Sequence, residues 1–258
     1  MTDTEYARSR FPRGLAQPQD GFRFSADALL LSAFAKPSPN SNVIDLGCGC
    51  GVVGMGILLK NPDRVLRVKA VDKDEHMIEL CGKNAAKLGL ENELFPERLD
   101  LGEQSPPNET FDLAVANPPY HSRKSGRHPQ KEGVLTAAFH DAVQDSLCTF
   151  LAAAKRTLKN RGGLCLVHRS ERLQEIMMRM EENRLRAKRM RFVHGGRERE
   201  SRLVLIEGVK NGAPGGCRLE PPLILYEDSR LTKQALEFCP FLASNTERGQ
   251  DQPKTGKF

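Results

Sequence analysis

The stretch VIDLGCGCG, residues 43–51, decides the fold of this chain. A short apolar run ends in closely spaced glycines. The next residues, 51–60 (GVVGMGILLK), have apolar positions spaced as in a helix, and VLRVKAVD (65–72) alternates like a strand. Strand, glycine loop, helix and strand in this order form a βαβ unit, which predicts a parallel sheet. The glycines permit a tight turn that a ligand can approach closely, and the helix that follows offers free N–H groups.

The same alternation of strands and helices continues to about residue 207. Further strands are predicted at 111–117 and 162–168, and helices at 74–89, 138–159 and 170–185. Two late runs, 188–194 and 202–210, flank a glycine-containing turn and predict an antiparallel pair. The sequence therefore predicts an α/β fold with a doubly wound parallel sheet and a C-terminal antiparallel hairpin.

Composition and charge narrow the class of protein. The 258 residues carry a net charge of +6, which fits a polyanionic partner or an ordinary solvated surface. The first ten residues lack the apolar core of a signal peptide, and no stretch approaches the roughly 18 apolar residues that span a membrane. The seven cysteines favour free thiols in a reducing cytosol. Neither they nor the histidines have metal-ligand spacing, so we expect a cytoplasmic protein with no membrane contact and no structural metal.

The glycine loop and the strand after it predict a cofactor site. Asp72 ends that strand about 20 residues beyond the glycines, where an acidic side chain can accept hydrogen bonds from ribose hydroxyls. A dinucleotide-binding loop has the pattern G-x-G-x-x-G, whereas residues 47–51 read G-x-G-x-G behind an acidic residue. This difference favours S-adenosylmethionine, which has no pyrophosphate and whose positive amino group suits Asp45. The alternative is that the glycines only form a tight turn.

These residues carry a resemblance to a known family. DLGCGCG (45–51) resembles motif I of class I S-adenosylmethionine-dependent methyltransferases, and Val71-Asp72 resembles their acidic end of strand two. RLDL (98–101) resembles the stretch in which an aspartate meets the adenine amine. The match covers most of residues 20–210 and implies a Rossmann-like, seven-stranded sheet that ends in an antiparallel pair. The cofactor-binding residues that it implies are Phe24, Asp27, Asp45, Gly47, Gly49, Gly51, Asp72, Lys73, Asp100, Leu101 and Asn117.

A second motif, NPPY (117–120), follows the strand at 111–117. Two adjacent prolines stop any helix or central strand, so the motif must be a rigid turn. It resembles motif IV of methyltransferases that act on exocyclic or amide nitrogens. The Asn117 side-chain carbonyl and the Pro118 backbone carbonyl could accept both protons of an amino group and align its lone pair. Pro119 stiffens the turn and Tyr120 would stack on a base, which makes these four residues the catalytic candidates.

Three further segments narrow the acceptor. GFRFSADALLLSAFA (21–35) resembles the N-terminal segment of the bacterial enzymes that methylate adenine N6 of the valine tRNA, next to the anticodon. TAAFHDAV (136–143) is similar to their A-R-H-E stretch, with Phe139 in place of the arginine and Asp141 in place of the glutamate. The run 122–131 follows NPPY directly and is basic; its candidate contacts to RNA are Arg123, Lys124 and Arg127.

The resemblance implies transfer of a methyl group from S-adenosylmethionine to an adenine N6 in RNA, with tRNA favoured and S-adenosylhomocysteine as the product. Two enzymatic alternatives stay open: a protein glutamine N5-methyltransferase and a ribosomal RNA guanine-N2 methyltransferase. A third is a catalytically silent cofactor-binding subunit of an RNA complex. A second basic run, 184–192, is either a solvated face or a phosphate-binding surface.

The expected organisation has four parts. Residues 1–41 form an N-terminal segment that packs on the cofactor site, and 42–210 form the methyltransferase domain. A Gly- and Pro-rich linker begins a C-terminal extension over 211–243, with a strand at 223–228 and a helix at 231–239. The polar tail, 244–258, is expected to be disordered.

Overall fold

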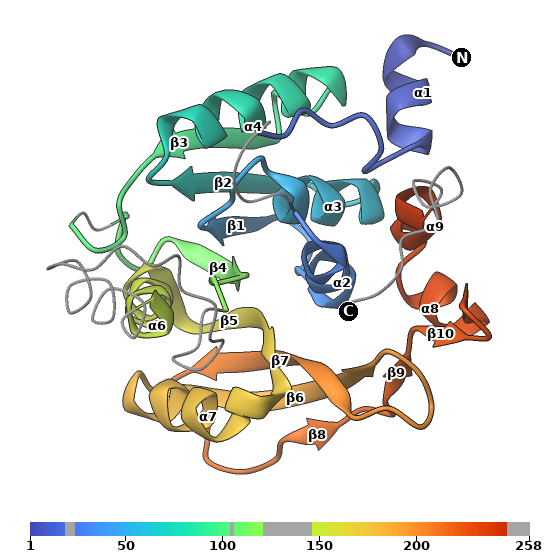
Figure 1. The fold of residues 1–258 in the computed structure, drawn as a ribbon. Helices are drawn as coiled ribbons and strands as arrows, with labels where there is room; N and C mark the ends of the chain where they lie inside the picture. The colour runs from blue at the N-terminus through green and yellow to red at the C-terminus, as the bar shows by residue number, and fades with distance from the viewer. Residues whose placement is uncertain (19–23, 104–105, 121–145, 247–258) are drawn as a thin grey trace, which may run out of the picture.

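The protein is described here by a computed structural model, which covers residues 1–18, 24–103, 106–120 and 146–246. A nine-stranded sheet runs through its centre (Figure 1), in the order β3-β2-β1-β4-β5-β7-β6-β8, with β9 also paired to β6. Its seven long strands are β1 (Ser41–Leu46), β2 (Leu66–Asp72), β3 (Leu94–Arg98), β4 (Phe111–Ala116), β5 (Leu158–Arg169), β6 (Leu185–His194) and β7 (Ser201–Lys210).

The strand directions confirm the predicted fold class. Neighbouring strands from β3 to β5 are parallel, and β7 pairs antiparallel with both β5 and β6. The two short strands, β8 (Arg218–Leu219) and β9 (Leu223–Ile224), extend the sheet beyond the seven that were expected, because the C-terminal extension pairs with β6.

Helices cover both faces of the sheet, and the apolar core is accordingly divided in two. One cluster of buried side chains lies under α2 (Ala26–Phe34), α3 (Val52–Lys60) and α4 (Glu75–Lys87), and the other under α6 (Ser146–Thr157) and α7 (Leu173–Glu182) (Figure 1). Strand residues alternate between the clusters with period two, as Val43 and Ile44 do in β1. A single turn of 3₁₀ helix, Ser170–Arg172, precedes α7 where one continuous helix was expected.

The N-terminal segment contains a helix that the sequence analysis did not assign, α1 (Asp3–Ser9). Its residues have no long apolar stripe; instead the Thr2 side chain and Glu5 form a reciprocal capping box. Arg8 docks the helix on the end of α4, because its guanidinium donates to the backbone carbonyls of Leu88 (2.7 Å) and Gly89 (2.9 Å). A cap and one docked arginine therefore fix a helix that hydrophobic periodicity does not predict.

Residues after α1 cross α4 and reach the glycine loop. The Asn84 amide bonds the backbone of Ala16 twice, through Oδ1 (2.7 Å) and Nδ2 (3.0 Å). The same Nδ2 donates to the Cys50 carbonyl at 3.0 Å. This buried amide thus ties the N-terminal segment to the loop after β1.

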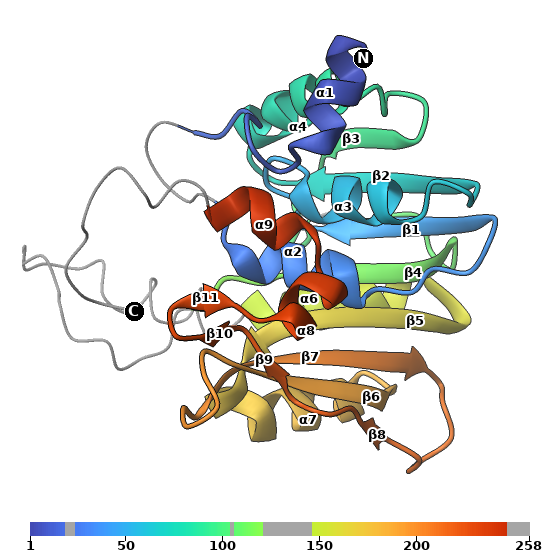
Figure 2. The same ribbon diagram turned by 90° about the vertical axis from the view of Figure 1, so that its right-hand side faces the viewer.

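The C-terminal extension returns to the α2 side of the sheet (Figure 2). The single strand expected over 223–228 is broken: β9 joins the main sheet, while β10 (Tyr226–Glu227) pairs with β11 (Arg230–Leu231). α8 (Lys233–Phe238) follows, with the Thr232 side chain accepting from the Ala235 N–H, and packs near α2. The last described helix, α9 (Phe241–Thr246), extends three residues into the segment expected to be disordered.

Candidate active site

The loop between β1 and α3 contains three glycines in the left-handed region. Gly47, Gly49 and Gly51 have φ values of 66°, 54° and 89°. A Cβ at Gly47 would lie 2.6 Å from the Phe150 ring, so a side chain is excluded there. A Cβ at Gly49 would meet no atom of the described residues within 4 Å, so these residues leave open space on that side of the loop. The loop is therefore a narrow backbone turn with room beside it for a ligand.

Asp72, at the end of β2, holds this loop in place. Its Oδ2 accepts from the Gly49 N–H at 2.9 Å and its Oδ1 from the Asp74 N–H at 3.0 Å. Asp72 is only half-buried, and an ionised carboxylate has about four acceptor sites. Acceptor capacity thus remains for the hydroxyls of a ribose. Lys73, the next residue, is exposed.

Asp45 is more deeply buried than a surface ligand contact requires. The residue is 1% exposed, and its Oδ2 accepts from the Gly54 N–H at 2.9 Å, in the first turn of α3. No side chain caps α3 at its N-cap, Gly51, so Asp45 satisfies one of the free N–H groups of that helix. Burial, with a contribution from the negative charge of Asp72, raises the pKa of Asp45 to about 7.

This raised pKa gives a test of Asp45 in the cofactor-free protein. In the unfolded chain Asp45 ionises near pH 4, whereas in the folded chain it keeps its proton until about pH 7. The folded state binds more protons over this window, so the free energy of unfolding falls as the pH rises, by at most about 1.4 kcal/mol per pH unit. Asp45→Asn removes this term, and its stability relative to the parent should increase between about pH 4 and pH 7 and stay constant above that. Urea titration checks the difference; parallel curves for the two proteins would contradict it.

The third acidic residue, Asp100, follows β3. It is half-buried, and its Oδ1 accepts from the Gly102 N–H at 2.9 Å, which fixes the turn. The preceding residue, Leu99, donates its N–H to the Asp72 carbonyl at 2.8 Å, and Leu101 is buried. The structure therefore brings the Asp100 turn beside Asp72.

The NPPY turn leaves the end of β4 next to the glycine loop. Leu46 and Ala116, the last residues of β1 and β4, are partners in the parallel register. The Tyr120 hydroxyl donates to Asn117 Oδ1 at 2.7 Å. A carbonyl oxygen has two lone pairs, so Oδ1 can accept a second hydrogen bond. Tyr120 thus fixes the orientation of the Asn117 amide and leaves it an acceptor.

Tyr120 is enclosed by three side chains from other elements. Burial, and after it the negative charge of Asp27 in the first turn of α2, raises the pKa of the Tyr120 hydroxyl well above its usual range. The His168 ring lies 5.0 Å from the tyrosine ring at an interplanar angle of 60°, and the Arg169 guanidinium lies 5.6 Å from its centroid. Sequence reasoning assigned no site role to His168 or Arg169. They end β5, the strand beside β4, and that position is the signal that could have identified them.

His168 is a neutral, buried group. Its Nδ1 accepts from the Arg169 N–H at 2.8 Å, and its Nε2 lies 3.4 Å from the Arg172 guanidinium. Burial and the positive charge of Arg172 lower the pKa of His168 to about 4. At neutral pH its imidazole is therefore uncharged and supports the Tyr120 ring.

Some predicted residues are not tested by this geometry. Phe24 is half-buried and packs against the core beneath α2 and α3. The basic residues Arg123, Lys124 and Arg127, and the segment 136–143, lie outside the described residues.

Within the described ranges, no three His, Cys, Asp or Glu residues are grouped to hold a metal ion. In that same part of the chain, no helix has the length and apolarity needed to span a membrane.

A seven-strand order with one antiparallel strand, a glycine loop after β1 and an acidic residue at the end of β2 define a class I methyltransferase fold. The chain belongs to the methyltransferase small domain family, whose model matches residues 25–192. Its structure resembles a solved protein from Agrobacterium tumefaciens, described as a predicted O-methyltransferase. That match has a TM-score of 0.66, 17% sequence identity and coverage of 83% of this chain and 96% of the other.

Two curated relatives differ in their acceptors. The tRNA1(Val) (adenine(37)-N6)-methyltransferase of a Flavobacteriaceae bacterium (strain 3519-10) is 25% identical over 198 residues, 76% of this chain and 80% of that protein. The human MTRF1L release factor glutamine methyltransferase is 33% identical over 139 residues, half of this chain. The match spans only 40% of the human protein's length.

Proposed function

We propose that this chain transfers a methyl group from S-adenosylmethionine to N6 of an adenine in RNA, with a tRNA near its anticodon as the favoured substrate. The observation that carries the proposal is the position of Asn117. Its amide oxygen is oriented by Tyr120 at the end of β4, directly beside the glycine loop that ends β1. The hydrogen-bond acceptor proposed for the adenine amino group and the proposed cofactor loop therefore lie at the ends of two adjacent strands.

The residues around the loop fit S-adenosylmethionine. Asp72 keeps acceptor capacity for ribose hydroxyls, the open side of Gly49 leaves room for the ligand, and the Asp100 turn lies beside Asp72 for the adenine amine. Asp45 is a buried carboxylate that a positive amino group would ionise. When bound, the cofactor supplies an electrophilic methyl carbon.

The chemistry needs an amino group prepared for attack. The lone pair of an adenine amine is delocalised into the ring, which makes the nitrogen a poor nucleophile. Hydrogen bonds from its two protons to Asn117 Oδ1 and to the Pro118 carbonyl favour a pyramidal nitrogen whose lone pair faces the methyl carbon. The proton leaves after methyl transfer, so this step requires no strong base, which agrees with the neutral, buried state of His168.

The comparisons support RNA over protein as the substrate because of the share of this chain that is matched, and not because of the percentage of identical residues. Similarity to the tRNA enzyme covers 76% of this chain, whereas similarity to the human glutamine methyltransferase covers half. The higher identity to the latter keeps a protein amide as the second candidate.

Transfer of labelled methyl groups separates these two candidates. The purified protein is incubated with labelled S-adenosylmethionine and, in parallel arms, with total RNA and with total protein extract. We expect the label in the RNA arm, and an Asn117→Ala control should abolish most of it. Label found only in protein would overturn the RNA assignment in favour of the amide acceptor.

The basic run after NPPY provides a separate prediction. If Arg123, Lys124 and Arg127 contact phosphates, replacing all three by alanine should weaken tRNA binding across sequences. The salt dependence should flatten by at most about one unit of slope per lost contact. Affinity for S-adenosylmethionine should not change, because that site is built from the glycine loop and Asp72. Filter binding at two salt concentrations is the measurement; affinity and slope equal to the parent's would make this run an ordinary surface.

A further inference from the structure

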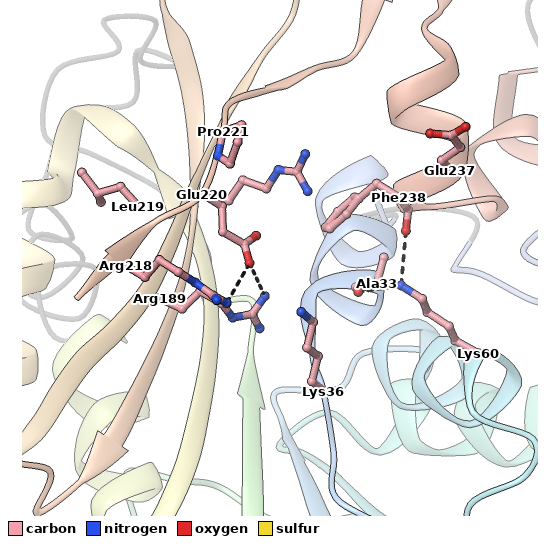
Figure 3. Close-up of a pocket in the computed structure, with 11 residues that line it drawn as sticks. Ala33, Lys36, Lys60, Arg189, Arg218, Leu219, Glu220, Pro221, Glu237 and Phe238 are labelled. Carbon is pink, nitrogen blue, oxygen red and sulfur yellow. Dashed lines mark hydrogen bonds and ion pairs between the residues drawn. The ribbon is translucent and has the colours of Figure 1, made fainter. Parts of the chain in front are cut away.

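A second site, lined mainly by positively charged side chains, lies on the α2 side of the sheet, away from the glycine loop. A cavity of about 490 Å³ opens between the end of α2, the strands β6 and β8, and α8 (Figure 3). Five cationic side chains line it, against the two carboxylates of Glu220 and Glu237: Lys36, Lys60, Arg189, Arg191 and Arg218. We call it the basic groove.

Internal ion pairs account for only part of this charge. Arg189 is buried and already satisfied, because it donates to Glu207 (2.7 Å) and to the Phe34 carbonyl (2.8 Å). Glu220 is shared between Arg189 (3.4 Å) and Arg218 (3.5 Å). Glu237, for its part, pairs with Lys233 at 3.6 Å. Both lining carboxylates are therefore engaged.

The remaining cations form no ion pair with the described residues, although the charge of Glu220 acts on Arg191. These cations are Lys36, Lys60 and Arg191; Lys60 donates instead to the backbone carbonyls of Ala33 (2.7 Å) and Phe238 (3.2 Å). Lys60 and Arg191 both lie over the Phe238 ring, at 5.5 and 4.6 Å from its centroid.

Two of these cations are also partly desolvated. Arg191 Nε is buried, and it finds no acceptor among the described residues. Burial lowers the pKa of both Lys60 and Arg191, and the neighbouring charges of Lys36 and Arg189 add to the effect on Lys60. Adjacent like charges and an unsatisfied buried donor destabilise the folded protein when no anion is bound. An anion with several acceptor oxygens would offset the repulsion and accept the hydrogen bond.

The position of the groove indicates which anion. α2 links the two sites: Asp27 in its first turn is close to Tyr120, whereas Ala33 near its end lines the groove. At 1.5 Å per residue, the helix rises by about 9 Å between Asp27 and Ala33. A nucleic-acid strand advances about 3.4 Å per stacked nucleotide, so a few nucleotides span that distance.

We propose that the basic groove binds the phosphodiester backbone of the RNA substrate a few nucleotides from the adenine held at Asn117. This proposal rests on the proposed function, and it also separates the two interpretations of the basic run 184–192. Arg189 and Arg191 face the groove, whereas Arg186 pairs with Glu181, and Lys188 donates to the carbonyls of Ala213 and Gly215.

The test compares two double variants with the same loss of charge. Lys36→Ala with Arg218→Ala removes two of the three exposed cations of the groove and keeps the third, Lys60, which donates to two backbone carbonyls. Lys83→Ala with Lys155→Ala is the control, on α4 and α6. The groove variant should weaken tRNA binding about 10-fold near 0.15 M salt and reduce the salt slope by about 1 to 2 units. The control and the parent should agree, and the affinity for S-adenosylmethionine should be equal in all three.

Three other outcomes would overturn the groove proposal, and they differ in whether the proposed function falls with it. If the parent methylates RNA but the groove variant binds it as the control does, RNA does not use the groove and the proposed function stands. If the parent neither binds nor methylates any RNA, the groove proposal fails together with the proposed function. If millimolar inorganic phosphate raises the Tm of the parent but not of the groove variant, while both bind tRNA equally, the groove is a small-anion site and RNA docking is wrong.

Discussion

The Asn117→Ala variant should methylate RNA roughly 100-fold more slowly than the parent, while its Kd for S-adenosylmethionine stays within a few-fold. The reason is that in the proposed mechanism the Asn117 oxygen acts on the amino group as it becomes a nucleophile, whereas the glycine loop and Asp72, which are hydrogen-bonded to each other, are proposed to hold the cofactor. An interaction that strengthens only in the transition state affects the rate and not the binding of either ligand. Single-turnover kinetics with saturating RNA and cofactor measures the rate directly.

Tyr120→Phe is the matched companion to this variant. It keeps the ring between His168 and Arg169 but removes the hydroxyl that donates to Asn117 Oδ1. Losing one neutral hydrogen bond costs about 0.5–1.5 kcal/mol, so the rate should fall by up to about 10-fold, less than for Asn117→Ala. An Asn117→Ala protein with nearly normal turnover would show that NPPY is only a structural turn.

The second large effect is expected at Asp72. Asp72→Ala should raise the Kd for S-adenosylmethionine by about 1.5–3 kcal/mol, or roughly 10- to 150-fold, through loss of charged hydrogen bonds to the ribose. The substitution also removes the hydrogen bond that the Gly49 N–H donates to Asp72 Oδ2 (2.9 Å). We therefore expect the glycine loop to become less ordered. The rate at saturating cofactor should change far less, because a ribose contact differs little between ground and transition states.

Asp74→Ala provides the control for this measurement. Asp74 lies two residues away and also carries a carboxylate, but that carboxylate caps α4 by accepting from the His76 N–H at 2.9 Å. Its removal should lower stability by about 1 kcal/mol and leave cofactor affinity unchanged. Calorimetry of both folded variants decides the matter: an unchanged Kd for Asp72→Ala would remove Asp72 from the cofactor site.

Local patterns explain why most of the fold could be predicted from the sequence. Strand residues such as Val43 and Ile44 alternate between two buried faces, and the glycines of 47–51 are required by positive φ values; both properties are encoded within a few residues. The prediction failed where tertiary contacts decide. α1 is held by Arg8 reaching the end of α4, in addition to its local cap, and the expected strand over 223–228 divides because each half pairs with a different strand.

The site shows the same division between local and distant information. Asn117 and Tyr120 could be named from one motif, and Asp72 from its distance to the glycines. The surroundings of Tyr120 could not, because Asp27 and Arg169 come from segments on either side of it in the chain and meet only in the fold. The basic groove is assembled from five separate elements or their flanks, so no window of sequence reveals it.

The central claim is that Asn117 presents the amino group of an adenine to a methyl donor bound at the glycine loop. The most direct test is to digest RNA labelled by the protein to nucleosides and identify the labelled species. We predict N6-methyladenosine as the dominant product, lost in the Asn117→Ala variant. Label in a methylated guanosine, or label confined to protein in the parallel extract, would contradict the claim.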